Sequence, residues 1–319
     1  MPTELTTDSP LAARLFAWSK ERFPPAFILV ILPLYGGTAA MAQLYQNGRV
    51  HFTAVDLLGV AACTAFLLLL RVFDEHKDYE LDSLNHPDRV LQRGLVTLRH
   101  LKFIAGGALI VQLAASLWAD ATVGQATLRW SVVLVWSLLM AKEFFVGEWL
   151  SKRLVLYAVS HMLILPMAVI WFMYLGSRGG DIPWEPQLWY AGLVFCLGAV
   201  AEVGRKFKAR EDEKETIDSY TKTLGVSGAS VVLAIVGVAA AGLQLKVISI
   251  LGGGAELGWG WYVPAVFAAL AVVGSAIHFA MKSTPKNAKM VEGMGAGALL
   301  ILYWGPLIAA LKFHNVTFF

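Results

Sequence analysis

The residues best suited to chemistry follow the second apolar run of the chain. Asp74, Asp78 and Asp82 recur every four residues, so a continuing helix would place them on one face about 6 Å apart. Like charges at that spacing repel one another, and a hard divalent cation such as Mg²⁺ relieves this repulsion because it prefers oxygen ligands. We therefore predict a metal site at Asp74, Glu75, Asp78 and Asp82, with catalytic roles for Asp78 and Asp82.

Basic residues flank these acids and indicate a phosphate ligand. Mg²⁺ held by few carboxylates usually also binds substrate phosphates, and arginine matches phosphate geometry with paired donors. The sequence predicts that Arg71, Arg89 and Arg93 supply these donors. The alternative is a solvated loop that follows the positive-inside rule, which explains the basic residues but not the six acids between residues 71 and 94.

A second charged cluster follows the sixth apolar run and mixes acids with bases. Its acids predict a second metal site at Glu202, Glu211 and Asp212. Its other polar residues, together with one lysine after the fourth run, predict a diphosphate-binding set of Arg205, Lys206, Lys208, Arg210, Lys142, Tyr220 and Lys222. Lys208 and Asp212 are further catalytic candidates. The alternative is a basic loop that touches anionic lipid headgroups.

The composition determines what kind of protein must position these clusters. Of the 319 residues, 57% are hydrophobic and 15% charged, whereas a soluble domain has about 25% charged residues. This composition excludes a cytosolic globular enzyme and a disordered protein. A net charge of +3 is too small for a surface that follows nucleic-acid phosphates. Cys63 and Cys196 both lie in apolar runs and predict no disulfide framework or metal site.

Long apolar runs predict an all-α polytopic membrane protein. A membrane helix needs about 20 mostly apolar residues, and its backbone amides must find partners within the helix. We predict nine such helices at 26–46, 52–73, 101–119, 128–146, 154–175, 187–204, 226–250, 258–281 and 290–311. They form one transmembrane domain over residues 26–319, with helical halves at about 26–150 and 151–311.

The distribution of basic residues predicts the orientation. With nine crossings, 21 Lys and Arg residues lie on the side of the N-terminus and 5 on the other side. The positive-inside rule then predicts a cell inner membrane protein whose N-terminus and acidic loops face the cytoplasm. Residues 1–25 lack the apolar stretch of a signal peptide. Leu11, Phe16 and Trp18 among basic residues predict a short helix in the membrane interface.

The first cluster resembles the first motif of the UbiA-type intramembrane prenyltransferase family. The family pattern Asn-Asp-x-x-Asp-x-x-x-Asp is here Asp74-Glu75-x-x-Asp78-x-x-x-Asp82, and the flanking positions that agree are Arg71, Pro87, Arg89 and Gly94. The resemblance in motif covers residues 71–94 and, loosely, 202–225. Asp74 and Glu75 differ from the family residues, and Lys208 and Arg210 stand among the acids expected in the second motif.

The resemblance implies a nine-helix fold with two cytoplasmic cap loops and an Mg²⁺-dependent activity. The implied reaction transfers a prenyl group from an isoprenoid diphosphate to an acceptor that the sequence does not identify. Terpene cyclisation and transfer of a phosphoribosyl or other group to a lipid phosphate are the alternatives within the family. A secondary transporter is the alternative of another class, but its charges are expected near the middle of the bilayer, and here they gather at helix ends.

Overall fold

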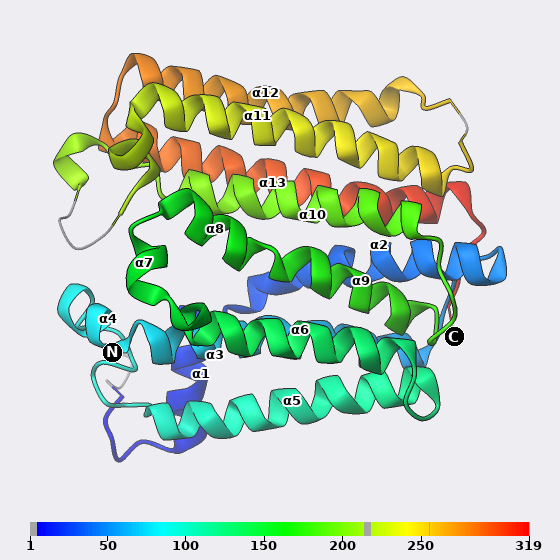
Figure 1. Cartoon of the computed structure of the whole chain (residues 1–319), viewed down its shortest axis with the longest axis horizontal. Coiled ribbons are helices and arrows are strands. Elements are labelled where there is room, and N and C mark those ends of the chain that lie inside the picture. The colour runs from blue at the N-terminus through cyan, green and yellow to red at the C-terminus, as the bar shows by residue number, and fades with distance from the viewer. Residues whose placement is uncertain (1–4, 214–217, 255, 319) are drawn as a thin grey trace.

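The computed structural model describes residues 5–213, 218–254 and 256–318, and most of them belong to helices that lie side by side (Figure 1). The longer helices are α1 (Leu11–Arg22), α2 (Ile28–Asn47), α3 (Ala54–Lys77), α5 (Leu98–Asp120), α6 (Gln125–Ala141), α9 (Ile164–Gly176), α10 (Trp184–Arg205), α11 (Tyr220–Leu251), α12 (Trp259–Met281) and α13 (Pro285–Phe313). Shorter elements are η1 (Pro25–Phe27), α4 (Tyr79–Asn85), η2 (Glu143–Phe145), α7 (Gly147–Ser151), α8 (Leu154–Met162), η3 (Arg210–Asp212), and the paired strands β1 (His51–Phe52) and β2 (Thr317–Phe318).

Eight helices of the described chain are long and apolar enough to cross a membrane. Two of these spans join neighbouring elements, η1 with α2 and α8 with α9. The fourth predicted span corresponds to α6, which is apolar but only 17 residues long. The prediction of an all-α polytopic membrane protein is therefore confirmed, while the count of nine crossings stays a prediction.

Helix α6 ends earlier than the predicted limit of residue 146 because the backbone turns left-handed. Glu143, Phe144 and Phe145 have φ angles of 48°, 54° and 59°. This region costs L-residues about 1–2 kcal/mol each, so surrounding contacts must hold it in place. The Phe144 ring packs edge-on against Trp136 and His161, with ring centroids 5.2 and 5.7 Å away.

Local sequence signals explain the helix starts near the charged loops. Thr97 accepts a hydrogen bond from the backbone of His100, which satisfies an amide at the start of α5. Ser219 accepts one from the backbone of Lys222 at 2.9 Å and begins α11. Gly225 interrupts α11 with φ 70° and ψ 164°, a conformation that glycine adopts without steric cost.

The two charged loops lie at the same end of the bundle. Residues 78–97, 206–213 and 218–219 lie at the left in Figure 1, where α1 and α7 also lie, whereas α13 ends at the right. We call this left side the polar end. Helix α1 confirms the predicted N-terminal helix, and Trp18 is buried against Val72 and Leu91 rather than exposed. Its position in a membrane interface stays a prediction.

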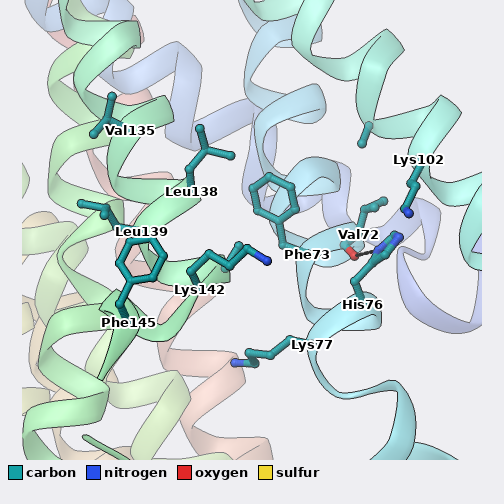
Figure 2. Close-up of a pocket in the computed structure, with 12 residues that line it drawn as sticks. Val72, Phe73, His76, Lys77, Lys102, Val135, Leu138, Leu139, Lys142 and Phe145 are labelled. Atoms are coloured by element: carbon teal, nitrogen blue, oxygen red, sulfur yellow. Dashed lines mark hydrogen bonds between the residues drawn. The ribbon is translucent and has the colours of Figure 1, made fainter. Parts of the chain in front are cut away.

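A groove of about 590 Å³ opens between α3, α5 and α6 near the polar end (Figure 2). Its wall is mainly hydrocarbon, contributed by residues such as Phe73, Ala105, Leu138 and Phe145. Lys142 also lines it. One of the residues predicted to bind diphosphate therefore lies in this groove.

Helices α2 and α9 are so close at Gly176 that a side chain at this position would collide with the backbone of α2. A Cβ added at Gly176 would lie 2.5 Å from Cα of Ala39, and backbone does not move aside as a flexible side chain does. We expect Gly176→Ala to lower the unfolding free energy by about 1–3 kcal/mol through overpacking. Thermal unfolding in detergent measures this. Gly242→Ala is the control, because its Cβ meets nothing within 4 Å. Equal melting temperatures for both variants would contradict the expectation.

Candidate functional site

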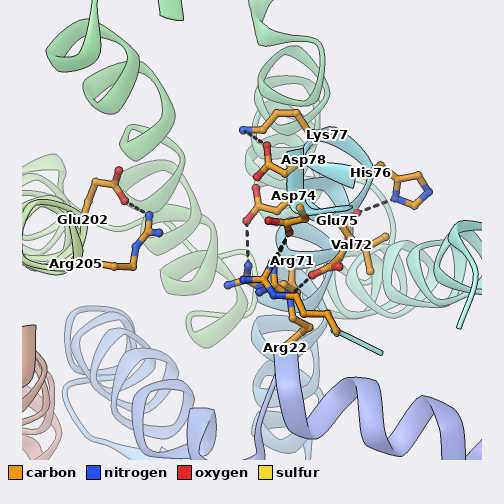
Figure 3. Close-up of polar contacts among 12 residues, drawn as sticks. Arg22, Arg71, Val72, Asp74, Glu75, His76, Lys77, Asp78, Glu202 and Arg205 are labelled. Atoms are coloured by element: carbon orange, nitrogen blue, oxygen red, sulfur yellow. Dashed lines mark hydrogen bonds and ion pairs between the residues drawn. The ribbon is translucent and has the colours of Figure 1, made fainter. Parts of the chain in front are cut away.

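The four acids predicted as metal ligands after the second apolar run, which we call the acidic stripe, divide into two groups that point in different directions. The stripe consists of Asp74, Glu75, Asp78 and Asp82. Figure 3 shows Asp74 and Asp78 facing α10, while Glu75 faces Arg22 on the other side. Helix α3 ends at Lys77, Asp78 occupies its C-cap, and Asp82 belongs to α4. The stripe therefore crosses the junction of two helices, and only its first part faces the second charged cluster.

Glu75 and Asp82 are held by arginines. Glu75 is 1% exposed and forms an ion pair with Arg22 of α1. Asp82 is 2.5 Å from Nη1 of Arg89 and 3.7 Å from Nη2 of Arg22. These contacts join α1, α3, α4 and the following loop, which indicates a structural role for both carboxylates.

Asp74 and Asp78 make longer ion pairs. Asp74 Oδ2 lies 3.6 Å from Nη1 of Arg71, and Asp78 Oδ1 lies 3.9 Å from Nζ of Lys77. Burial raises the pKa of Asp78 above its ordinary value, and the charges of Asp74 and other nearby acids raise it further while Lys77 opposes them. An added cation would stabilise the ionised form of this carboxylate.

The C-terminal end of α10 provides the opposing half of the site. Glu202 lies 2.6 Å from Nη2 of Arg205 and 2.7 Å from Nζ of Lys206. Figure 3 shows Glu202 and Arg205 on the side of α10 that faces Asp74. Arg205 and Asp74 are near enough for their charges to interact. The structure therefore places the first acids of both predicted clusters on helix sides that face each other.

The rest of the second cluster lies farther along the chain. Glu211 and Asp212 are exposed on η3, with Arg210 exposed beside them. Lys208 is half-buried and its backbone amide binds the Thr221 hydroxyl. The remaining predicted residues also differ in exposure: Tyr220 is buried at the start of α11, whereas Lys222 and, in the first loop, Arg93 are exposed.

The oxygen ligands suit a hard cation, although they are not gathered in a finished metal site. Within the described ranges, no group of three or more His, Cys, Asp or Glu residues is arranged to hold a metal ion. Mg²⁺ commonly uses only one or two carboxylates and completes its octahedron with water and substrate phosphate. Asp74 and Asp78 fit this requirement because their present ion pairs are long. The individual metal ligands stay a prediction.

Four residues outside the predicted site set complete the polar end. Lys77 Nζ donates a hydrogen bond to the Tyr157 hydroxyl at 2.8 Å, and that hydroxyl donates to Oε1 of Glu143 at 3.2 Å. The Tyr157 ring stacks on His161 with centroids 4.0 Å apart. The left-handed backbone at Glu143 aims its carboxylate at Tyr157. Strained backbone of this kind often accompanies functional sites. Only the four-residue spacing of Tyr157 and His161 was a signal in the sequence.

Arg22 is the other residue missed, because its partner Glu75 is 53 positions away. Removing one member of a buried ion pair leaves the other charge unpaired and costs about 3–5 kcal/mol. We expect Arg22→Met to lower the melting temperature strongly, and Glu75→Gln in the same chain to restore part of it. A double-mutant cycle by thermal unfolding measures the coupling.

Lys20→Met is the matched control for this cycle, because Lys20 is exposed on the same helix. It should change stability little. A coupling energy near zero between Arg22 and Glu75 would contradict the structural role of this ion pair.

Solved structures with the same architecture come from UbiA homologues. A digeranylgeranylglyceryl phosphate synthase aligns with 94% of this chain and 99% of its own, at 17% identity and TM-score 0.61. The apo UbiA homologue from Aeropyrum pernix K1 aligns with 88% of this chain and 97% of its own, at 17% identity and TM-score 0.62. The UbiA homologue from Archaeoglobus fulgidus, bound to GPP and Mg²⁺, aligns with 93% and 99%, at 13% identity and TM-score 0.51.

Comparisons of sequence alone give no such match. No protein-family model matches the chain, and no curated protein matches it significantly. Similarity at these identities is a similarity of backbone arrangement, and it extends over nearly the whole length of each partner. The chain therefore has the fold of the UbiA homologues.

Proposed function

We propose that this protein is an Mg²⁺-dependent intramembrane prenyltransferase that acts on an isoprenoid diphosphate. The observation that carries the proposal is that Asp74 of α3 and Asp78 at its C-cap face Glu202 and Arg205 of α10, at one end of a UbiA-type bundle. This arrangement offers anionic oxygens for a cation and a cationic group for a phosphate. The homologue from Archaeoglobus fulgidus, which was solved with GPP and Mg²⁺, supports the same ligand class.

The chain's own groups would divide the work between cation and phosphate binding. Asp74 and Asp78 are the proposed metal ligands on α3, and Glu202 is the proposed ligand on α10. Bound Mg²⁺ would supply a Lewis acid that neutralises the leaving diphosphate. Arg205 and Arg71 lie beside these acids and would donate hydrogen bonds to the phosphate oxygens.

The proposed reaction breaks the bond between the allylic carbon and the diphosphate oxygen. The electron pair leaves with the diphosphate, the carbon becomes an allylic cation, and an acceptor nucleophile then bonds to it and loses a proton. Positioned charges stabilise the leaving group most effectively where water is excluded. The apolar helices below the polar end would provide that exclusion and would accommodate the prenyl tail.

The remaining predicted residues and the orientation belong to this proposal. The predicted ligands Glu211 and Asp212 and the predicted phosphate-binding residues Arg210 and Lys208 would join the site only if their segment moves toward α10 when substrate binds. The excess of basic residues at the polar end supports a cytoplasmic orientation of this end, in a cell inner membrane.

One assay separates prenyl transfer from the alternatives. Purified protein is incubated with Mg²⁺ and isoprenoid diphosphates from C10 to C20, and released diphosphate and products are measured. A cyclase would release diphosphate without an acceptor, whereas a phosphoribosyl transferase would consume phosphoribosyl diphosphate and a lipid phosphate. Absence of diphosphate release from every substrate would overturn the proposal and favour a transporter.

Asp78 provides a direct test of the metal role. Asp78→Asn keeps the side-chain shape but removes the charge, so we expect diphosphate release to fall at least a hundredfold while the protein still folds. Asp88→Asn is the matched control, because Asp88 is exposed in the following loop. Near-normal turnover of Asp78→Asn at saturating Mg²⁺ would rule out this ligand.

The two candidate acids of the second cluster can be compared in the same way. Glu202 faces Asp74, whereas Glu211 is exposed on η3. We expect Glu202→Gln to raise the Mg²⁺ concentration needed for half-maximal turnover at least tenfold more than Glu211→Gln does. The opposite order would place the second metal ligands on η3.

A further inference from the structure

The groove between α3, α5 and α6 lies on the side of α3 that faces away from the carboxylates. Positions 72, 73, 76 and 77 line the groove, whereas Asp74 and Asp78 face α10. At 3.6 residues per turn, positions 72, 73 and 76 lie on the side of α3 opposite Asp74, and Lys77 lies between the two sides. The groove is therefore distinct from the proposed reaction site.

The groove combines an apolar wall with cations at one end. Phe73, Ala105, Leu138 and Phe145 contribute hydrocarbon surface along α3, α5 and the end of α6. Figure 2 shows Lys102 near His76 on one side and Lys142 extending from the other side toward α3. These basic groups stand at the polar end, where a helix bundle meets the headgroups of a bilayer. Such a gradient from hydrocarbon to positive charge complements an anionic amphiphile.

The lysines of the groove differ in whether the protein already uses them. Lys77 is bound to the Tyr157 hydroxyl and lies 3.9 Å from Asp78, so it borders the groove mainly through its stem. Lys102 and Lys142 are exposed, and no carboxylate pairs with either in the part of the chain that the structure describes. Two cations beside an apolar groove are therefore available to a ligand.

His76 adds a buried polar atom at the same place. Its Nδ1 lies 2.8 Å from the carbonyl oxygen of Val72 and donates to it. Its Nε2 is buried and has no hydrogen-bond partner among the described residues. Because Nδ1 donates, Nε2 of the neutral ring is an acceptor. Buried polar atoms are normally satisfied, so this nitrogen indicates that a hydrogen-bond donor, such as a headgroup hydroxyl, belongs at this end of the groove.

We propose that this groove binds a phospholipid with an anionic headgroup. Its phosphate contacts Lys102 and Lys142 beside His76, and an acyl chain lies along Phe73, Ala105 and Leu138. Basic pockets between transmembrane helices are known to hold anionic lipid headgroups. The volume of about 590 Å³ is within the usual range for a ligand site. The lipid would be a bound component of the bundle rather than the substrate.

Native mass spectrometry of the full chain in detergent tests this proposal. Phosphatidylglycerol and phosphatidylcholine with identical acyl chains are added, and we expect tighter retention of phosphatidylglycerol. Each cation near a membrane surface contributes about fivefold to such binding. The double variant Lys102→Gln/Lys142→Gln should therefore lower the apparent affinity for phosphatidylglycerol by about 25-fold. If the double variant fails to fold, Lys102→Gln alone should lower it by about fivefold.

The matched control removes two positive charges elsewhere at the polar end. Lys286 and Lys289 are exposed at the start of α13, and they do not line the groove. Lys286→Gln/Lys289→Gln should leave retention of phosphatidylglycerol unchanged. An equal loss in both double variants would show general attraction to the surface and would overturn the proposal.

Two further arms identify the ligand. Ala105→Phe fills the apolar wall while keeping both lysines, so it should weaken phosphatidylglycerol binding. If binding is unchanged in this variant, or if inorganic phosphate displaces the lipid, the groove is a site for free anions and the proposal is overturned. Geranyl diphosphate should not displace the lipid, and competition would assign the groove to the substrate. These readouts measure binding, so their failure leaves the proposed prenyl transfer untouched.

Discussion

The polar end depends on compensation of carboxylate charge at the boundary between protein, membrane and water. An ionised carboxylate removed from water is stable only when cations or hydrogen-bond donors replace its hydration. Glu75 meets this requirement at Oε1 through Arg22, while its buried Oε2 has no hydrogen-bond partner among the described residues, and Asp82 meets it through Arg89. The same two arginines connect α1 and the loop after α4 to the end of α3, so charge compensation also determines how the cap of the bundle is assembled.

The carboxylates of the acidic stripe differ in how closely cations neutralise their charge. This difference separates the carboxylates with a structural role from those proposed to bind ligands. Glu75 and Asp82 pair with arginines of α1 and of the loop after α4, so these two carboxylates hold the cap together. The short ion pairs of Glu202 stay within the C-terminal end of α10 and would have to open before Glu202 could bind a cation. The long ion pairs of Asp74 and Asp78 leave negative charge that a ligand can neutralise. Glu202 and Arg205 on α10 add the complementary charges opposite them.

The two sides of α3 give the helix two uses. One side presents carboxylates toward α10, and the other side forms the wall of an apolar groove with lysines at its end. The left-handed turn at Glu143–Phe145 serves both sides, because Glu143 reaches Tyr157 beside Lys77 and Phe145 lines the groove. Strain in this turn is thus compensated by contacts on each side of α3.

The sequence by itself determined the all-α membrane class, the approximate positions of the helices and the two charged loops. Long apolar runs and the bias of basic residues can be read directly along the sequence. A helix in hydrocarbon satisfies its own backbone hydrogen bonds, so each span can be recognised without knowledge of its neighbours. The motif at Asp74–Asp82 was equally local. By contrast, the early end of α6 and the Arg22–Glu75 pair depended on contacts between distant segments. Only the tertiary structure decided that Glu202 faces Asp74 while Lys142 lines a separate groove, because spacing along a chain does not specify which sides of different helices meet.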